Sequence, residues 1–229
     1  MPVALVDYVS DNAGQLYFYA QQHFLLVLYA VLLASAIALA LGVVLHTNEL
    51  TPSSWSRQLR AGGREGALLL SSAALTVPSL ALFGLLQPVL GLGVVPSLTA
   101  LTIYGIYPVL RNTVAGLSSV EPAVLEAARG MGLGPVRRVL RVQLPLAWPV
   151  VVSGIRVATL ILIGIAVVAA SVSGPGLGQP LFTGLGRLGA AESFEQVLAG
   201  TLGCLVVAAV FELLFLVVAR LTTPRGIRA

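Results

Sequence analysis

Residues 24–45 read FLLVLYAVLLASAIALALGVVL, a run with no charged residue. A helix needs about 20 apolar residues to cross the roughly 30 Å hydrocarbon core of a bilayer. The run is therefore long enough to predict a transmembrane helix. It lies inside a wider interval, residues 12–48, that contains no Asp, Glu, Lys or Arg.

The whole chain shares this character. Of its 229 residues, 57% are hydrophobic and only 10% are charged, whereas an ordinary soluble domain has about 25% charged residues. The composition argues against an ordinary soluble domain, and the ample apolar surface argues against a disordered chain. The single Cys204 cannot form an internal disulfide, and no Cys/His cluster suggests a metal site.

Three further intervals lack charge, at residues 66–110, 157–186 and 196–211. The first is long enough for two helices, which Gln87-Pro88 and Gly91-Leu92-Gly93 would separate. We therefore expect an all-α polytopic membrane protein, with a single transmembrane domain over residues 1–229. The five expected spans lie near residues 24–45, 67–86, 94–110, 150–171 and 197–218.

The basic residues predict an orientation. All 13 are arginines, and eleven fall in the segments after the first and third spans or at the C-terminus. Membrane proteins keep such residues on the cytoplasmic side, so we expect an outside N-terminus and a cytoplasmic C-terminus. Because topology accounts for the net charge of +4, and no basic run is interleaved with stacking aromatics, we expect no nucleic-acid partner.

The cytoplasmic segment 111–145 is too long for a simple connection and too weakly charged to stay unfolded. Ser119 is expected to cap a helix over about residues 122–129, which Gly130 and Gly132 end. Gly132 is expected to adopt positive φ where the chain turns back. A second short helix, which starts with a proline, is expected over about residues 135–142. Pro145 is expected to break the chain before the fourth span.

This segment carries residues at a specific spacing. Glu126-Ala127-Ala128 is followed after three residues by Gly132, and after nine more by Val142-Gln143-Leu144-Pro145. The pattern resembles the EAA signature of ABC importer permeases, E-A-A-x3-G-x9-I-x-L-P, with Val142 in the place of the isoleucine. The alternative to a coupling segment is a cytoplasmic loop that packs only against the helix bundle of its own chain. The resemblance implies that seven residues couple the chain to an ATPase: Glu126, Ala127, Ala128, Gly132, Val142, Leu144 and Pro145.

The resemblance also implies a fold and a set of partners. It implies a type I importer permease in the cytoplasmic (inner) membrane of a prokaryote, with the coupling helices between the third and fourth spans. The implied partners are ABC ATPase subunits, a second permease that is an identical copy or a related chain, and an extracytoplasmic substrate-binding protein. Because this chain has no Walker sequence, it is expected to be no enzyme and to bind no cofactor, with ATP and Mg²⁺ held by the ATPase.

Three further stretches narrow the resemblance. Residues 77–82 (VPSLAL), 107–113 (YPVLRNT) and 174–178 (GPGLG) look like those of glycine betaine/carnitine/choline permeases, which import quaternary-amine osmoprotectants. An ABC permease for an amino acid or a sulfonate is the alternative cargo assignment. An autonomous channel or secondary transporter is disfavoured, because we find no inverted repeat of the kind such transporters contain.

Prolines at membrane depth are tolerated where protein or a water-filled cavity satisfies the freed carbonyls. Helices two and three contain several prolines, which are expected to break or bend them, so we expect these helices to line the translocation pathway. For the two tyrosines in this region, packing at an interface is the alternative. The pathway candidates are Pro78, Tyr104, Tyr107 and Pro108.

Two ionisable residues lie within expected spans. Glu212 would be expensive at membrane depth, so we expect it to face the bundle interior, where it pairs with Arg156 or is protonated. A tolerated acid near a wet interface is the alternative. Residues 174–189, on the outside, are interpreted as a re-entrant segment, a docking loop for the binding protein or a flexible connection.

Overall fold

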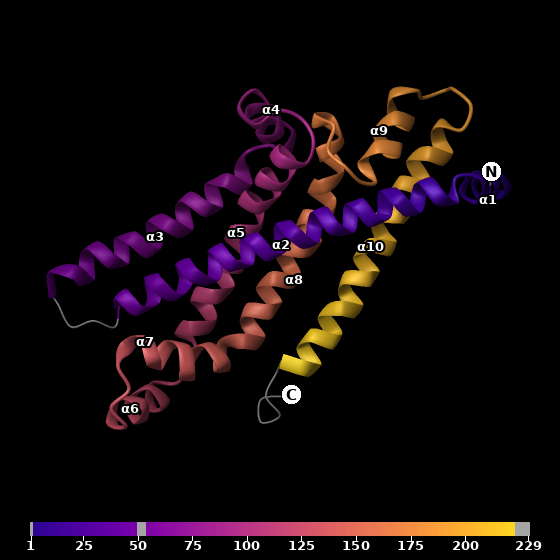
Figure 1. The fold of residues 1–229 in the computed structure, drawn as a ribbon. Helices are drawn as coiled ribbons and strands as arrows, with labels where there is room; N and C mark the ends of the chain where they lie inside the picture. The colour runs from indigo at the N-terminus through magenta and orange to yellow at the C-terminus, as the bar shows by residue number, and fades with distance from the viewer. Residues whose placement is uncertain (1, 50–53, 223–229) are drawn as a thin grey trace. The chain divides into compact units, whose positions relative to one another are not determined.

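The computed structural model describes residues 2–49 and 54–222, with side chains for residues 5–47 and 62–222. These residues form helices joined by turns, and no strand occurs among them (Figure 1). Arg225 and Arg228, which contribute to the predicted orientation, lie outside the described residues. The elements are α1 (Pro2–Asp11), α2 (Ala13–Glu49), α3 (Ser54–Thr76), α4 (Ser79–Leu90), α5 (Val94–Ser118), α6 (Pro122–Gly130), α7 (Pro135–Arg138), the π-helix η1 (Val139–Gln143), α8 (Leu144–Val168), the 3₁₀-helix η2 (Ala169–Val172), α9 (Gly178–Gly186) and α10 (Ser193–Thr222).

The apolar helices agree with the predicted class. Four described helical segments are long and apolar enough to cross a membrane: Ala13–Thr47, Val94–Ser118, Pro135–Val172 and Ser193–Thr222. The broken pair formed by α3 and α4 raises the number to five if it counts as one span. The all-α polytopic fold is thus confirmed, while the exact limits of each span stay predictions.

The chain breaks between α3 and α4 at Val77 and Pro78, inside the span expected over residues 67–86. Pro78 precedes the first residue of α4 with φ −57° and ψ 131°, outside the helical region. A proline has no N–H for a helical hydrogen bond, and it pushes the residue before it toward extended conformations. The break or bend expected at Pro78 is therefore present as a break, whereas Pro88, expected to help separate the second and third spans, lies inside α4.

The chain divides into two compact units. Unit 1 comprises Met1–Leu32, Val77–Ile103 and Thr159–Leu213, and unit 2 comprises Leu33–Thr76, Tyr104–Ala158 and Leu214–Ala229. In unit 1, the rings of Phe24 on α2 and Phe211 on α10 stack with their centroids 4.7 Å apart.

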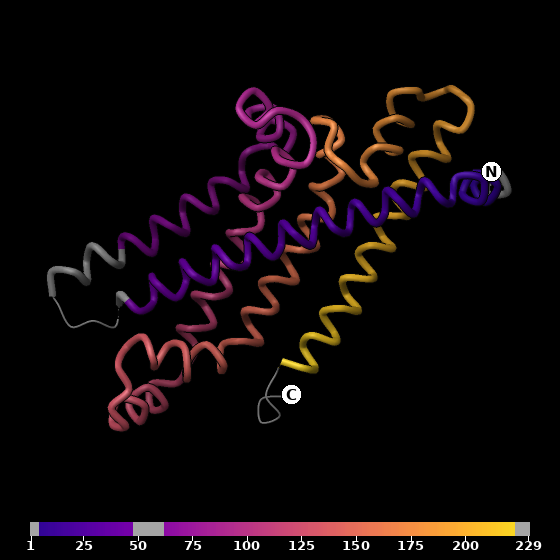
Figure 2. Tube along the Cα trace, in the orientation of Figure 1, coloured from indigo at the N-terminus to yellow at the C-terminus, as the bar shows by residue number. Residues whose placement is uncertain are grey.

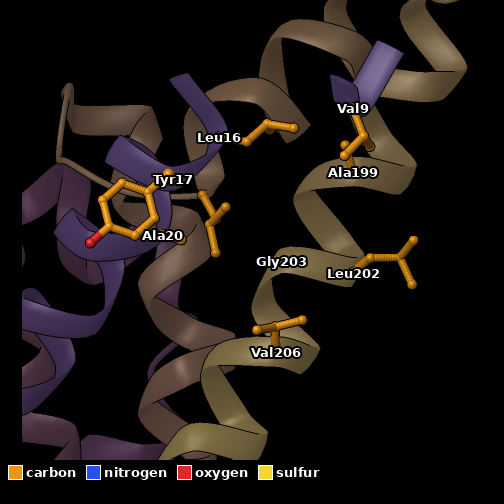
Figure 3. A pocket seen from close by; sticks show the side chains of 9 residues that line it. Val9, Leu16, Tyr17, Ala20, Ala199, Leu202, Gly203 and Val206 are labelled. Atoms are coloured by element: carbon orange, nitrogen blue, oxygen red, sulfur yellow. The ribbon is translucent and has the colours of Figure 1, made fainter. Parts of the chain in front are cut away.

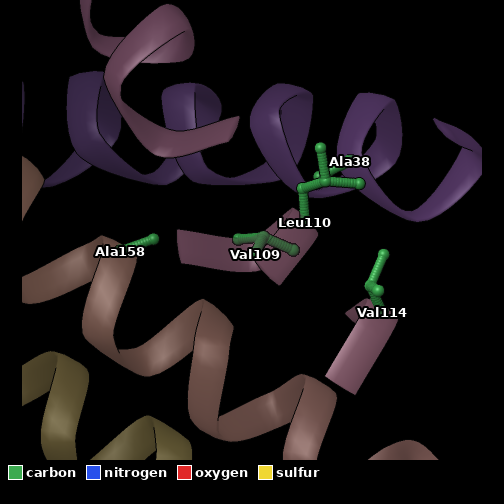
Figure 4. Close-up of a cluster of buried hydrophobic side chains, with 5 residues drawn as sticks. All are labelled: Ala38, Val109, Leu110, Val114 and Ala158. Carbon is green, nitrogen blue, oxygen red and sulfur yellow. The ribbon is translucent and has the colours of Figure 1, made fainter. Parts of the chain in front are cut away.

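In unit 2, a cluster of buried side chains joins α2, α5 and α8, and each member is at most 3% exposed (Figure 4). Most members are small or β-branched, which lets neighbouring helices approach closely in an apolar environment. This packing positions the C-terminal end of α5, from which the candidate coupling segment begins. The cluster consists of Ala38, Val109, Leu110, Val114 and Ala158.

The stretch YPVLRNT explains part of this packing. A Cβ atom added at Gly154 on α8 would lie 2.5 Å from Cβ of Asn112 and 3.0 Å from the carbonyl oxygen of Pro108. The amide of Asn112 donates to that same carbonyl at 2.8 Å. The proline and asparagine of the stretch therefore form the contact surface between α5 and α8, where only glycine fits.

Candidate functional site

The candidate coupling segment folds into two short helices, α6 and α7, which lie side by side after α5 (Figure 1). The expected cap by Ser119 is wrong. Its Oγ donates to the carbonyl of Gly116 at 2.9 Å, and the residue before α6 is Glu121, whose side chain makes no capping bond. Because α5 runs to Ser118, the hydroxyl of Ser119 satisfies a carbonyl at the end of α5 instead.

The turn after α6 has the hydrogen bonds of a Schellman motif. The N–H of Leu133 donates to the carbonyl of Ala128 at 3.1 Å, and the N–H of Gly132 donates to that of Arg129 at 2.9 Å. Gly132 has φ +78°, a conformation that a residue with a Cβ atom adopts only with strain. The expectation that Gly132 turns the chain back is confirmed.

The three residues of the Glu-Ala-Ala element have different surroundings. Glu126 and Ala127 are exposed, whereas Ala128 is 1% exposed. Ala128 therefore packs against its own chain, whereas the carboxylate of Glu126 and the methyl group of Ala127 are accessible to another protein.

The break expected at Pro145 does not occur. The helix continues from α7 through the π-helix η1 into α8, and the N–H of Leu144 donates to the carbonyl of Val139, five residues earlier. Pro145 has no N–H for the carbonyl of Arg141. In a π turn, an N–H donates to the carbonyl five residues earlier instead of four. Because this turn directly precedes Pro145, the missing N–H of the proline does not end the helix. Pro145 is exposed, and Val142 and Leu144 are half-buried.

Sequence reasoning passed over Gln143, the residue inside the last element of the signature. Its side chain is fully buried, and neither amide atom has a hydrogen-bond partner among the described residues. Val139 and Ala147 lie one turn to either side of it and belong to a buried cluster with Leu117. The sequence did hold one indication of this burial, because Gln143 is the polar residue in the otherwise apolar stretch Val142-Gln143-Leu144-Pro145.

The pathway candidates have different surroundings. Tyr104 on α5 is 2% exposed, Pro108 is buried and Tyr107 is half-buried. Pro78 is exposed and belongs to unit 1, whereas the other three belong to unit 2. Their role in a pathway stays a prediction.

The two residues of the predicted intramembrane charge pair also belong to different units. Arg156, exposed on α8, belongs to unit 2, and Glu212, half-buried on α10, belongs to unit 1. The pairing of their charges therefore stays a prediction.

The glycine-rich segment GPGLG packs tightly inside unit 1, before the short helix α9 and the turn that leads into α10 (Figure 2). A Cβ atom added at Gly176, where φ is +117°, would lie 2.9 Å from Nδ1 of His23 on α2. His23 is fully buried, and its Nε2 lies 3.2 Å from the carbonyl oxygen of Ile163 on α8. His23 is a second residue that sequence reasoning missed, although a histidine in an apolar span is its signal. Whether residues 174–189 are a re-entrant segment, a docking loop or a flexible connection stays open.

Unit 1 also holds an apolar pocket of about 320 Å³ between the N-terminal helices and α10. Figure 3 shows Leu16 and Tyr17 on one side and Ala199 and Val206 on the other. The residues that line the pocket include no charged side chain. Among the described residues, no three His, Cys, Asp or Glu side chains gather as a metal site would require.

Comparison with known proteins places the chain among transport proteins. It is 34% identical over 224 residues to the choline transport system permease protein OpuBB of Bacillus subtilis (strain 168), covering 98% of this chain and 96% of that protein. It is 35% identical over 228 residues to the osmoprotectant import permease protein OsmW of Salmonella typhimurium (strain LT2), covering 97% of this chain and 99% of that protein.

The fold has a counterpart among solved structures. A chain of the MetNI methionine ABC transporter, solved in inward-facing conformations, superposes with a TM-score of 0.76 at 18% identity, covering 91% of this chain and 96% of that one. Residues 63–225, which include the whole candidate coupling segment, match the family described as "Binding-protein-dependent transport system inner membrane component". This chain belongs to that family, as a multi-pass membrane permease component of ABC importers.

Proposed function

We propose that this chain is the permease subunit of an ATP-driven, binding-protein-dependent importer of quaternary-amine osmoprotectants, the class that includes glycine betaine, choline and carnitine. The observation that carries the proposal is likeness over nearly the whole chain to permeases named for choline and for osmoprotectant import. The methionine transporter resembles this chain at only 18% identity and supports the fold alone, so the amino-acid alternative gains nothing from it.

The coupling segment supports the ATP-driven part of the proposal. An ATPase drives a permease only through a contact that transmits its movement. On α6, exposed Glu126 and Ala127 offer one charge and one small side chain, and an arginine on the partner could bind the carboxylate. The Gly132 turn and the π-helix fix α6 and α7 to the start of α8, so that movement of α6 reaches a spanning helix.

The proposal includes an orientation and a stoichiometry. The coupling segment faces the cytoplasm, the N-terminus lies outside, and two permease subunits stand over two ATPase subunits. ATP and Mg²⁺ bind to the ATPase, and the binding protein reaches the permease from the outside. The excess of arginine in segment 111–145 supports this orientation through the positive-inside rule.

A reconstituted system tests this function. The chain is co-expressed with candidate ATPase and binding-protein subunits from the same organism, purified as a complex and placed in proteoliposomes that contain ATP. We expect ATP-dependent uptake of radiolabelled choline, glycine betaine or carnitine. Methionine and taurine serve as comparison solutes. Uptake of a comparison solute in place of the quaternary amines would contradict the cargo, and uptake without an ATPase would contradict the transporter class.

A further inference from the structure

A second pocket, of about 160 Å³, lies within unit 2 between α8 and the last two turns of α10. One wall carries Ser153 and Arg156 from α8, and the other carries Phe215, Leu216 and Ala219 from α10. The pocket therefore combines a guanidinium and a hydroxyl with apolar side chains. Neither the coupling segment nor the pathway candidates contribute to it.

The position of the pocket along α10 places it near a membrane surface. Ala219 lies three residues before the end of α10 at Thr222, about 4.5 Å along the helix axis, and Phe215 lies about 10.5 Å from that end. Arg156 shares the pocket with both residues, so it lies close to this end although it is twelve residues into α8. When α10 crosses a bilayer, a position this close to its end lies where lipid headgroups meet acyl chains.

The polar side of the pocket suits an anionic oxygen group. Ser153 and Arg156 are three residues apart on α8, so both face the same side of the helix, and both are exposed. A guanidinium carries five N–H donors in a planar fork that matches phosphate, so Arg156 can bind a phosphate in addition to a partner within the chain. Arg220 follows Leu216 by one turn and Glu212 precedes it by one turn. This face of α10 therefore carries one charge of each sign, and the anion would depend on Arg156 and Ser153.

The apolar side of the pocket distinguishes a lipid from a soluble anion. Leu216 is 51% exposed, and its neighbours Leu214 and Val217 are 43% and 53% exposed. This apolar surface continues from the pocket along α10. A soluble phosphate would contact only the polar wall, whereas a phospholipid would also cover the exposed apolar surface. Basic pockets between transmembrane helices bind anionic headgroups by this combination.

We propose that this pocket binds the phosphate of an anionic phospholipid, with Arg156 and Ser153 as donors and an acyl chain along Phe215 and Leu216. Inorganic phosphate shares the headgroup chemistry and is the competitor that the test must separate. The site is independent of the proposed transport function, because it requires only that the chain lie in a membrane.

Native mass spectrometry of the purified full-length chain tests the proposal. The chain is loaded with equal amounts of phosphatidylglycerol and phosphatidylcholine, and the retained lipid adducts are counted. We expect preferential retention of phosphatidylglycerol, and a loss of about tenfold in Arg156→Gln, which removes charge-assisted hydrogen bonds. Arg187→Gln, a change of the same kind at the exposed end of α9, is the matched control and should retain the lipid. Inorganic phosphate should not displace it.

A second variant keeps the test decisive if Arg156→Gln does not fold. Ala219→Trp fills the pocket and leaves Arg156 in place, so it should lose phosphatidylglycerol while helical content and elution volume stay unchanged. The proposal is overturned if either well-folded variant retains phosphatidylglycerol at the wild-type level. It is equally overturned if Arg156→Gln loses both lipids alike, or if inorganic phosphate displaces the lipid.

Discussion

The imidazole of His23 on α2 lies directly against Gly176, because a Cβ atom added at Gly176 would lie 2.9 Å from its Nδ1 and 3.1 Å from its Cβ. His23 also lies against α8 through the carbonyl oxygen of Ile163. The two residues therefore join three parts of unit 1. Because the contact leaves no room for a side chain at Gly176, the addition of a single methyl group at that position tests it.

Gly176→Ala should destabilise the chain. The added methyl group collides with His23, and φ of +117° is nearly exclusive to glycine, so the cost is about 1–3 kcal/mol or more. The measurement is the midpoint of thermal unfolding in detergent, which should fall. Gly164→Ala is the control, because nothing lies within 4 Å of a Cβ atom at Gly164 in α8. A midpoint as high in Gly176→Ala as in the control would contradict the contact.

Gly132→Val should uncouple the transporter without preventing membrane insertion. A β-branched residue at φ +78° is strained by about 1–3 kcal/mol, so the turn after α6 reopens and α6 loses its fixed position. Solute uptake by the reconstituted complex and membrane abundance of the chain are the two measurements.

Gly130→Ala is the matched control for this turn, because Gly130 has no positive φ and no atom within 4 Å of an added Cβ. Uptake should persist in the control and disappear in Gly132→Val. Normal uptake in Gly132→Val would show that the turn does not serve coupling.

Glu126→Lys should weaken the contact with the ATPase. The side chain is exposed on α6, so reversal of its charge leaves the fold of the chain intact but places a cation where the partner meets a carboxylate. Copurification of the ATPase and ATP-driven uptake should both fall. Glu121→Lys makes the same charge change at an exposed position before α6 and should retain both. Equal losses in the two variants would point to net charge rather than to Glu126.

Glu212→Gln tests the predicted role of the acid in α10. A carboxylate at membrane depth costs about 2.5–3.5 kcal/mol on insertion scales, so we predict that Glu212 faces the bundle interior, where it pairs with Arg156 or is protonated. The amide removes the charge, and assembly or uptake should weaken. Glu195→Gln, in the first turn of α10, is the control. Normal expression, assembly and uptake in Glu212→Gln would reject the role.

Features that depend on composition or on one residue's backbone geometry were predictable from the sequence. The charge-free intervals predict the apolar helices because a bilayer sets a minimum length. Pro78 predicts the break between α3 and α4 because proline lacks a donor. Gly132 predicts the turn after α6 because it tolerates positive φ. In each case the cause lies within a few residues of the effect.

The incorrect or missed predictions depend on competition with other groups. Ser119 is a good capping residue, but the carbonyl of Gly116 takes its hydroxyl. Pro145 should break a helix, but the π turn before it shifts the hydrogen bonds by one residue. His23 meets Ile163 at a distance of 140 residues in sequence, which no local pattern can reveal.

Gln143 supplies the remaining prediction, which concerns stability. A buried amide without a partner costs about 1–3 kcal/mol, and both polar atoms of Gln143 lack one among the described residues. Gln143→Met keeps the length of the side chain and removes its polar atoms, so the isolated chain should unfold at a higher temperature. Gln15→Met, at an exposed position on α2, controls for the general effect of an added apolar side chain. A lower midpoint in Gln143→Met would mean that the amide is satisfied in the folded chain, and the explanation by desolvation would fail.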